Sequence, residues 1–482
     1  MTLLLIKNSK GKLATIKERK PVDFQPKRIK LILTAVTMML LLGTTFIFLL
    51  LRVNAKAIDK LAQEIDKAKE ESFNGKLWAV LVAGSNGFYN YRHQADVCHS
   101  YHVLRNHGVP EENIIVMMYD DIAYSDENPL KGFIRNRPGG PNVYAGVPKD
   151  YTSEEVTPEN FLAALSGDNA LKAKGKKVVE SSKDDHIFVY FADHGATGLI
   201  AFPTSELHSK PFNDKLLEMS KEKRFRKMVI YIEACESGSM FDGLLPPNIN
   251  IYATTAANPY ESSYACYDDD ELDTYLGDDY SVNWLQHSDS LLSLTTETLE
   301  QQYQIVKKET QTSHVMQYGD LNMSKLPLSQ FQGSKTALNA TKNSACIDGV
   351  PSRDVPLIIT AKKYERSEEP LKSTYKLKLD AMIAARSFFD SFMQALVENI
   401  LSPFDLSPKE MFNTREPLRQ HDCYETMVRT FDQSCFDISQ HQYALRFLFV
   451  FSNICNRFSD DAELEMLHPI TQLIDPNPTL TH

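Results

Sequence analysis

The stretch HIFVYFADHG at residues 186–195 and the stretch MVIYIEACESG at residues 228–238 decide the fold. Each is an unbroken apolar run that is followed at once by polar residues and a glycine. A near-continuous apolar run is typical of a strand that is covered on both faces, as in a parallel sheet. Ligands and catalytic groups collect at the carboxyl ends of strands in open α/β sheets. The residues that follow these two runs are therefore the first candidates for a functional site.

Further apolar runs alternate with helix-patterned segments in this part of the chain. The runs lie at residues 77–82, 113–119 and 250–254, and the helix-patterned segments lie at residues 95–106 and 213–223. Strands that alternate with helices indicate an α/β domain with a mainly parallel sheet flanked by helices. We expect this domain to span residues 74–323.

The chain has 482 residues, enough for about three domains, and its C-terminal part has a different pattern. Residues 324–372 are rich in Ser, Thr, Lys and Pro and lack periodicity, which predicts an exposed linker. Apolar residues then recur at intervals of three and four, which predicts helices. These residues are Leu379, Met382, Ile383, Phe389, Phe392, Leu396 and Ile400. With another helix expected at residues 441–456, residues 373–482 are predicted to form a small all-helical domain and a tail.

The N-terminal part predicts a membrane anchor. Residues 31–51 carry no charge, and 21 residues at about 1.5 Å each span about 31 Å, which is one bilayer core. Residues 1–30 are basic, which places them in the cytosol, and residues 52–73 are interpreted as a stalk. A cleaved signal peptide is the alternative, because Ala55-Lys56-Ala57 is similar to a cleavage site. Either way the bulk of the chain enters the secretory route.

The composition excludes several classes of protein. A net charge of -11 gives no field that would attract nucleic acid, so we expect no nucleic-acid partner. Seven cysteines in a chain of this length cannot form a disulfide framework, and their odd number leaves at least one outside any intrachain pair. Cys98 and Cys266 are interpreted as buried thiols.

The two strand ends carry a histidine and a cysteine. His194 follows the first run and Cys235 follows the second, 41 positions later. A thiol becomes a competent nucleophile when an imidazole takes its proton, and the backbone amides of Gly195 and Cys235 could stabilise an oxyanion. Taken singly, each residue fits a structural role, as a small buried cysteine or a turn histidine. Taken together, their order and spacing resemble the caspase signature and favour a catalytic pair.

Two other clusters invite a metal interpretation. The first comprises His93, Cys98, His99, His102 and His107, which do not all share one face of a helix. The second is the acidic run at residues 268–273, which lacks the spacing and glycine of an EF-hand and is interpreted as a solvated loop. We therefore predict no metal site and no organic cofactor.

Longer motifs show that the chain resembles the legumain family, the asparaginyl endopeptidases of caspase-like fold. The motifs are VLVAGSNGFYNYRHQA at residues 80–95, VMMYDDIAYS at 116–125, GVPKDY at 146–151, YIEACESGSM at 231–240, YATTAANP at 252–259 and SSYACY at 262–267. The resemblance implies that Cys235 is the nucleophile, His194 the general acid/base and Asn90 the residue that orients the histidine. It covers most of the chain from about residue 77 onward.

The same resemblance places a pocket for the asparagine side chain of the substrate, called the S1 pocket. It implies the charged residues Arg92, Glu233 and Asp278, the pocket wall at Ser262 and Ser263, and His93 beside Arg92. An asparagine side chain offers a carbonyl acceptor and an NH2 donor, so a cation and carboxylates suit its two sides. An exposed surface charge is the alternative for Arg92.

The helical C-terminal domain resembles the family's prodomain, which covers the active site of the zymogen. This implies a disulfide between Cys423 and Cys455. Cys435 matches a member of a second bridge whose usual partner is absent, and Cys346 in the linker is a possible substitute. The prodomain carries more acidic than basic residues, as does the whole chain, so local ion pairs would have to hold it in place.

Activation in the family follows cleavage after asparagine, for which the linker offers Asn339 and Asn343. Asn322 and Asn339 also begin glycosylation motifs, and a glycan at Asn339 would conflict with cleavage there, so Asn343 is the cleaner site. The glycosylation motifs and the N-terminal apolar segment fit a lumenal enzyme, either a type II membrane-anchored precursor in the secretory or endolysosomal system or a soluble secreted or lysosomal form after cleavage. The anchor departs from the family, whose members usually begin with a cleaved signal.

The sequence thus predicts a cysteine endopeptidase made as a zymogen, which cleaves peptides and proteins after Asn and, at lower pH, after Asp. Its expected partners are these substrates, its own prodomain, the membrane and cystatin-type inhibitors. An asparaginyl ligase or transpeptidase is the related alternative. The transamidase that attaches glycolipid anchors shares the dyad but lacks such a prodomain. A membrane-tethered binding protein without activity is the alternative from another class.

Overall fold

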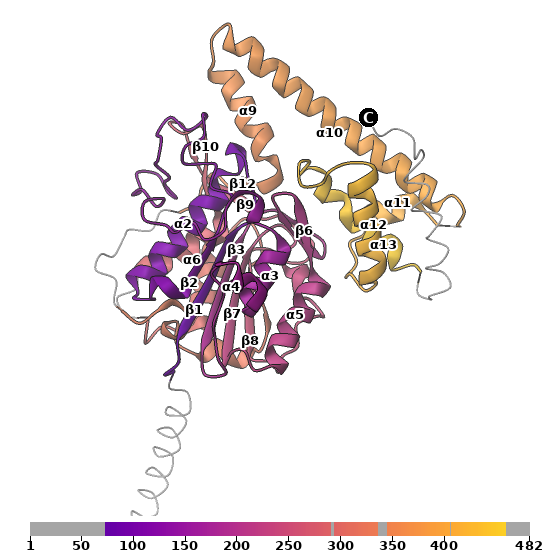
Figure 1. Cartoon of the computed structure of the whole chain (residues 1–482). Coiled ribbons are helices and arrows are strands. Elements are labelled where there is room, and N and C mark those ends of the chain that lie inside the picture. Colours follow the sequence, from indigo (N-terminus) through magenta and orange to yellow (C-terminus); the bar gives the residue numbers. More distant parts are fainter. Residues whose placement is uncertain (1–72, 291–293, 336–344, 405, 459–482) are drawn as a thin grey trace, which may run out of the picture. The chain divides into compact units, whose positions relative to one another are not determined.

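The computed structural model describes residues 73–290, 294–335, 345–404 and 406–458. A six-stranded sheet lies at its centre, in the order β11-β8-β7-β3-β1-β2 (Figure 1). Five strands are parallel, and β11 is antiparallel to β8. Their bounds are β1 (Leu77–Ala83), β2 (Ile114–Met117), β3 (His186–Ala192), β7 (Lys227–Glu233), β8 (Ile251–Thr255) and β11 (Met316–Gly319). The predicted mainly parallel sheet is therefore confirmed.

The apolar runs are continuous because both faces of the sheet are buried. In β1, Leu77, Ala79 and Leu81 belong to one core cluster, and the intervening Trp78 and Val80 belong to another. The first cluster packs under α2, α6 and α7, and the second packs under α3 and α5. The helices of this domain are α2 (Tyr91–Asn106), α3 (Pro158–Ser166), α4 (Asn169–Ala173), α5 (Ser209–Lys221), α6 (Asp279–Ser290), α7 (Leu299–Glu309) and α8 (Ser329–Gln332).

Two small sheets lie beyond the central one. The first contains β4 (Gly195–Ala196), β5 (Leu199–Phe202) and β6 (Ser205–His208), and it begins directly after His194. The second contains β9 (Tyr264–Asp269), β10 (Thr274–Asp278) and β12 (Val350–Pro351). The acidic run at residues 268–273 includes the turn of the β9–β10 hairpin.

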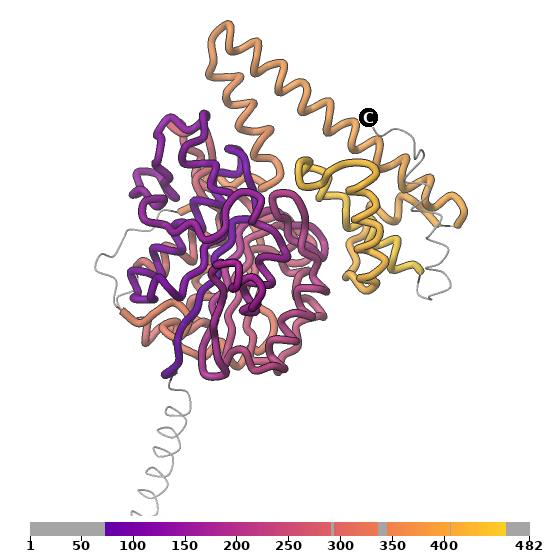
Figure 2. The backbone as a smooth tube through the Cα atoms, viewed as in Figure 1, coloured from indigo at the N-terminus to yellow at the C-terminus, as the bar shows by residue number. Residues whose placement is uncertain are grey.

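The C-terminal region is helical, as predicted. It contains α9 (Val355–Arg366), α10 (Leu371–Leu401), α11 (Pro408–Asn413), α12 (His421–Ser434) and α13 (Leu448–Cys455). Figure 2 follows the chain from the sheet domain through α9 and α10 (orange) to these last helices (yellow). The helix expected at residues 441–456 begins only at Leu448, after the short 3-10 helix Ala444–Phe447.

The predicted linker is more ordered than its composition indicated, because it contains β12 and α9. Val355 and Ile359 of α9 pack against Ala265 and Tyr275 of the β9–β10 hairpin. Lys362 and Arg366 lie 2.6 Å from Asp268 and 2.5 Å from Asp270, so local ion pairs reinforce this contact. The acidic loop is thus partly neutralised by the linker instead of being solvated throughout.

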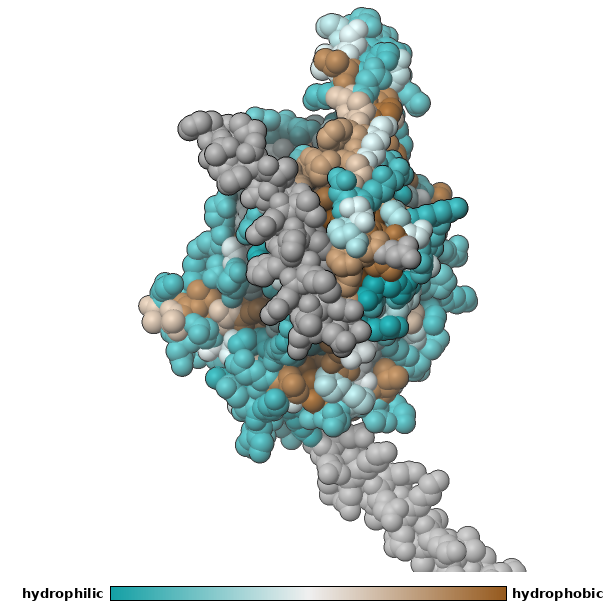
Figure 3. All heavy atoms as spheres, turned by 90° about the vertical axis from the view of Figure 1, so that its right-hand side faces the viewer, coloured by the Kyte–Doolittle hydropathy of each residue, from teal (hydrophilic) through white to brown (hydrophobic). Residues whose placement is uncertain are grey.

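Exposed apolar side chains occur along α10. They are Leu371, Leu377, Ile383 and Phe388. Figure 3 shows apolar side chains (brown) among polar ones (teal) on one face of the molecule. The C-terminal half of the helix instead buries Phe389, Leu396 and Ile400 in the core of the helical region.

No helix within the described ranges is both long enough and apolar enough to cross a membrane. The predicted basic tail (1–30), the predicted span (31–51) and the stalk up to Ser72 lie outside the described residues.

Burial predicts a contrast between two leucines. Leu81 is fully buried in β1, and Leu377 of α10 is 73% exposed. Leu81→Ala should lower the free energy of unfolding of the sheet domain by about 2–5 kcal/mol, because it leaves a cavity. Leu377→Ala is the matched control and should change it by less than about 0.5 kcal/mol. Denaturant titration in a Cys235→Ala background measures both, and similar costs would contradict the assigned core.

Candidate active site

His194 and Cys235 lie at the same edge of the sheet. Strands β3 and β7 are parallel neighbours, and Ala192 is in register with Glu233. His194 and Cys235 each follow two residues later, so both reach the carboxyl edge at the same level. Their side chains are buried, at 1% and 0% exposure. The sheet thereby brings together the two residues that the sequence singled out.

Asn90 fixes the orientation and protonation of the imidazole. His194 Nε2 lies 2.9 Å from Asn90 Oδ1, which can only accept, so Nε2 carries the proton. Asn90 Nδ2 donates to the Asn86 carbonyl at 2.8 Å, which sets the orientation of the amide. His194 Nδ1 is then unprotonated, is buried and has no hydrogen-bond partner among the described residues. It is available to accept a proton.

Cys235 contacts Ser263 across the site. Its Sγ accepts from the backbone N–H of Ser263 at 3.3 Å, and the Ser263 hydroxyl lies 3.8 Å away. Burial raises the pKa of the Cys235 thiol, although the guanidinium of Arg353 acts in the opposite direction. Burial also lowers the pKa of His194 well below its ordinary value, and the cations Arg92 and Arg353 add to this effect. The described state therefore favours a neutral thiol and a neutral imidazole.

Gly195 is required where the two strand ends meet. A Cβ at this position would lie 2.5 Å from the Cys235 carbonyl oxygen and 3.0 Å from the Ala234 side chain. The backbone of Gly195 thus lies against that of Cys235, beside the nucleophile. The oxyanion role of the Gly195 and Cys235 amides stays a prediction.

Arg92 lies at the centre of the predicted S1 pocket. It is 1% exposed, so the alternative of a surface charge is wrong. Its Nε donates to Asp278 Oδ1 at 2.8 Å, and its Nη2 donates to Ser352 Oγ at 2.6 Å. Glu233 Oε2 accepts from the Ser281 hydroxyl at 3.0 Å. Arg92, Glu233 and Asp278 therefore come from α2, β7 and β10 to one buried region.

This region contains more carboxyl groups than cations. Asp96, Glu233 and Asp278 are all buried, and burial raises the pKa of each carboxyl. Arg92 opposes the increase for Asp278. The oxygens Glu233 Oε1 and Asp278 Oδ2 have no hydrogen-bond partner among the described residues. This buried region thus places unpartnered carboxyl oxygens, which are hydrogen-bond acceptors, beside a guanidinium, which is a donor.

The other predicted pocket residues lie nearby. His93 Nδ1 is 2.6 Å from Ser85 Oγ, and His93 Nε2 is 3.6 Å from Asp278 Oδ2. Ser263 is buried next to Cys235, and its neighbour Ser262 is half-buried. Asp96 was not among the residues predicted from the sequence, although it lies one helical turn after Arg92. Its Oδ2 accepts from the Asp278 backbone N–H at 3.2 Å and so holds β10 against α2.

The first histidine cluster does not form one site. Cys98 contacts Met118, His99 contacts Asn136 and Asp289, and His102 contacts the Val143 carbonyl. Ligand atoms of His93, Asp193 and His194 do lie within 4.8 Å of one another, close enough to hold a metal ion. In the described state His93 and His194 instead contact Ser85 and Asn90.

A segment of the linker covers the site. Val350 and Pro351 of β12 pair antiparallel with Ala265 and Tyr264 of β9. The next residue, Ser352, donates its backbone N–H to the Ser263 carbonyl at 3.0 Å and accepts from Arg92. Ser352 therefore binds the Arg92 guanidinium, which is the group that the predicted pocket would offer to a substrate.

Arg353 completes this cover. It is 6% exposed, donates to the Gly195 carbonyl and forms a bidentate pair with Glu236, the residue after Cys235. Glu236 also accepts from Arg415 in the helical region at 3.1 Å. Tyr424 of α12 donates to the Thr197 carbonyl, and Ala196 and Leu199 join the apolar core of the helical region. Sequence reasoning missed four residues of this contact. Glu236 lies in the motif at residues 231–240 but was given no role, and no motif marks Ser352, Arg353 or Arg415.

The disulfides confirm one prediction and correct two. Cys423 and Cys455 are bonded, as expected from the resemblance. Cys266 is bonded to Cys346, so the interpretation of Cys266 as a buried thiol is wrong, and Cys346 does not substitute as a partner of Cys435. Cys435 is half-buried and belongs to neither bond. Cys98 is a buried thiol, as predicted.

A buried thiol and an oriented imidazole at adjacent strand ends define the class as a cysteine peptidase. The Peptidase C13 family model matches residues 77–334, and the model described as Legumain, prodomain matches residues 377–469. The chain belongs to the peptidase C13 family.

Individual relatives agree. Legumain of Rattus norvegicus is 49% identical over 391 residues, which cover 80% of this chain and 89% of that protein. Legumain of Homo sapiens is 48% identical over 392 residues, 80% and 90% of the two chains. A vacuolar-processing enzyme delta-isozyme of Arabidopsis thaliana is 42% identical over 426 residues, 81% and 89%. The chain is thus an asparaginyl cysteine endopeptidase made with a prodomain, and the ligase alternative is not favoured.

A solved structure, caspase-1 from Spodoptera frugiperda, matches weakly. It covers 52% of this chain and 89% of that chain, with a TM-score of 0.30 and 10% identity. We draw no conclusion from this score.

The hydrogen bond from His194 to Asn90 generates a prediction. Asn90→Ala should lower kcat of the prodomain-free enzyme by roughly 10²-fold with little change in KM, because the imidazole loses the acceptor that keeps Nδ1 unprotonated. The exposed Asn169→Ala is the matched control and should behave as wild type. An unchanged kcat in steady-state peptide hydrolysis would show that Asn90 does not orient the histidine.

Proposed function

We propose that Cys235 attacks the backbone carbonyl carbon of an asparagine residue in the substrate, with His194 as the general acid/base. His194 Nδ1 accepts the thiol proton and returns it to the leaving amine, and water then hydrolyses the thioester. The observation that supports this most strongly is the register of β3 and β7, which brings His194 and Cys235 to the same edge of the sheet. The hydrogen bond from His194 Nε2 to Asn90 also leaves His194 Nδ1 unprotonated. The amides of Gly195 and Cys235 bind the oxyanion.

The proposed S1 pocket selects asparagine by its two-sided amide. Arg92 donates to the side-chain carbonyl, and the unpartnered oxygens of Glu233 and Asp278 accept from the NH2 group. Ser262, Ser263 and His93 line the remainder. A glutamine side chain has the same carbonyl and NH2 groups, but they lie one methylene further from the backbone. Neither group is then aligned with its partner in the pocket. An aspartate lacks the NH2 donor and has to be protonated before it can donate, which is why its cleavage requires lower pH.

The linker and the helical region act as the inhibitor of the zymogen. The Ser352 hydroxyl accepts the hydrogen bond that Arg92 would otherwise donate to a substrate. Arg353 binds both the Gly195 carbonyl and Glu236. Cleavage after Asn343, or after Asn339 where no glycan is attached, starts activation. Both asparagines lie outside the described residues.

Protonation of His194 makes the opening of the covered active site more favourable at acidic pH. In the covered state, burial and nearby cations hold the pKa of His194 well below its ordinary value of about 6.5. Removal of the cover restores water and takes away Arg353, so the pKa rises and the open state binds a proton. Above the ordinary pKa both states are neutral and this contribution vanishes. As the pH falls below it, the open state is increasingly favoured.

We propose that the enzyme works in the lumen of the secretory or endolysosomal system. Two disulfides need an oxidising compartment, and Asn322, the first residue of a glycosylation motif, is exposed on a 3-10 helix. The type II anchor, the soluble form after cleavage and inhibition by cystatin-type proteins stay predictions of the sequence. A catalytically silent binding protein is the remaining alternative, and the intact arrangement of Asn90, His194 and Cys235 disfavours it.

One experiment tests this function. The full chain is acidified and incubated with two peptides that differ only by Asn or Gln at the cleavage position, and mass spectrometry identifies the products. We expect cleavage after Asn at a rate at least about 10²-fold above that for Gln, because a misaligned side chain leaves buried polar groups unpaired. Cys235→Ala should abolish it. Persistence of hydrolysis in that variant, or an uncleaved Asn peptide after prodomain removal, would overturn the proposal.

Arg353 gives a separate prediction about latency. Arg353→Gln removes the cation shared by Gly195 and Glu236, so the uncut full chain should hydrolyse the Asn peptide measurably at neutral pH, where the wild-type zymogen is silent. The exposed Arg419→Gln is the matched control and should stay latent. Equal latency of both variants in a continuous peptide assay would exclude Arg353 as part of the inhibitory contact.

A further inference from the structure

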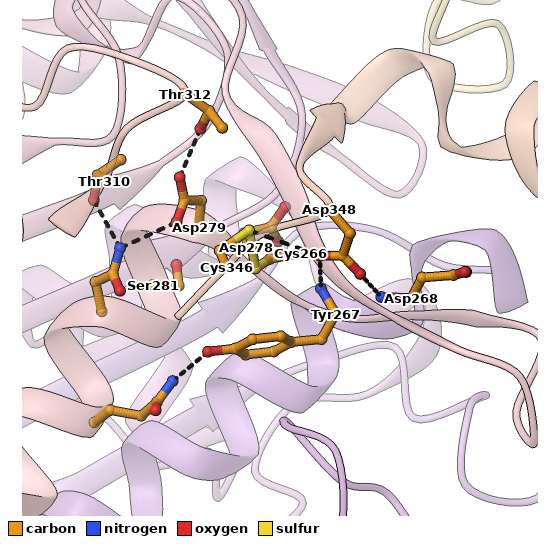
Figure 4. The surroundings of a disulfide bond; sticks show 12 residues. Cys266, Tyr267, Asp268, Asp278, Asp279, Ser281, Thr310, Thr312, Cys346 and Asp348 are labelled. Carbon is orange, nitrogen blue, oxygen red and sulfur yellow. Dashed lines mark hydrogen bonds between the residues drawn. A yellow bond between two sulfur atoms is a disulfide. The ribbon is translucent and has the colours of Figure 1, made fainter. Parts of the chain in front are cut away.

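A disulfide joins the covering segment to the catalytic domain. Cys266 lies in β9 and is fully buried, and its partner Cys346 precedes β12 by four residues (Figure 4). The bond spans 80 positions of the sequence. These 80 positions include α6, α7, β11 and α8, all of which belong to the catalytic domain.

The residues after Cys346 are fastened to β9 and its neighbours one after another. The Asp348 carboxylate accepts from the backbone N–H groups of Tyr267 at 3.0 Å and Asp268 at 2.6 Å (Figure 4). Val350 pairs with Ala265 two residues later. Ser352 and Arg353, which cover the site, are thus six and seven residues from a covalent attachment to the strand that borders it.

The position of the asparagines relative to this bond matters. Asn339 and Asn343 both precede Cys346, and the next asparagine after Cys346 is Asn399, within α10. A cut at either predicted activation site therefore falls inside the loop that the disulfide closes. The peptide bond is broken, but Cys346 remains attached to Cys266.

We propose that activation passes through a disulfide-linked two-chain form, in which the C-terminal fragment with Ser352 and Arg353 stays bonded to β9 after the cut. This inference rests on the proposed cleavage after Asn339 or Asn343. Release of the fragment then requires either a second cut beyond Cys346 or a dithiol reductant. In the reductive route the dithiol is oxidised to its own disulfide, and Cys266 and Cys346 each gain a proton and become thiols.

The tether changes how strongly the cover inhibits. A segment held by a short covalent link has an effective concentration in the millimolar range, so it rebinds faster than a free fragment. When acid opens the cover, the covering segment cannot diffuse away from the enzyme, because the disulfide still holds it. The cut enzyme should therefore remain partly inhibited as long as the Cys266–Cys346 bond is intact, and a reducing compartment should increase its activity.

The decisive experiment places a cut in the loop without using the enzyme's own activity. A recognition sequence for an unrelated site-specific protease replaces residues 337–342 in the full chain with Cys235→Ala, and the cut protein is analysed by denaturing electrophoresis. Without reductant we expect one band at the mass of the uncut chain, and with a dithiol two bands. Cys346→Ser should give two bands without reductant.

A matched control moves the cut to the other side of the disulfide. With the recognition sequence placed in the exposed turn at residues 367–370, α10 to α13 should separate without reductant. Separation of the fragments after the first cut, without reductant and with Cys346 intact, would overturn the tether.

Activity tests the inhibitory part in the same molecules with Cys235 restored. After the engineered cut at acidic pH without reductant, the chain with the disulfide should hydrolyse the Asn peptide at least about tenfold more slowly than Cys346→Ser, because the tethered cover stays at millimolar effective concentration. Equal rates would exclude the tether as a brake. If neither chain hydrolyses the peptide, the proposed function fails, whereas the electrophoresis still decides whether the tether exists.

Discussion

The parallel pairing of β3 with β7 is the constraint on which the site depends. Because Ala192 and Glu233 are partners, His194 and Cys235 leave the sheet at the same level. A slip of one residue in this register would turn one of the two side chains to the opposite face. The cores on both faces prevent such a slip, since each strand buries alternate residues in different clusters. The geometry of the dyad is therefore set by apolar packing well below the active site.

The second determinant is the burial of charge around Arg92. One guanidinium lies among Asp96, Glu233 and Asp278, and the backbone of β10 is tied to α2 through Asp96. Unpaired carboxyl groups in a buried site are costly unless they are protonated or meet a donor. In the S1 pocket that we propose, an asparagine amide that donates to these carboxyl groups would offset this cost.

Much of this could be predicted from the sequence, for a physical reason. The strands are continuous apolar runs because both faces are covered, and the residues of the dyad stand directly at their ends. Arg92 and Asp278 are separated by 186 positions, and their contact was expected only through the family resemblance. Asp96 is one turn from Arg92, but its role depends on the backbone of β10, which no local pattern reveals.

The covering segment could not be predicted in this way. Ser352 and Arg353 sit in a stretch whose Ser-, Thr- and Pro-rich composition indicates an open linker, and its structure comes from pairing with β9 and from Glu236. The pairing of Cys266 with Cys346 also depends on that tertiary contact. Residues 31–51, whose pattern predicts a membrane span, lie outside the described structure.

The loop closed by Cys266 and Cys346 has an entropic side. While the chain is intact, this crosslink restricts the unfolded state of an 80-residue segment, a restriction equivalent to about 4–5 kcal/mol of stability in the chain-entropy model. A single cut inside the segment turns the closed loop into two open ends, and this contribution is lost although no native contact changes. The cut, disulfide-linked form would then unfold more readily than the uncut precursor, so that the first step of activation also sets a limit on its lifetime.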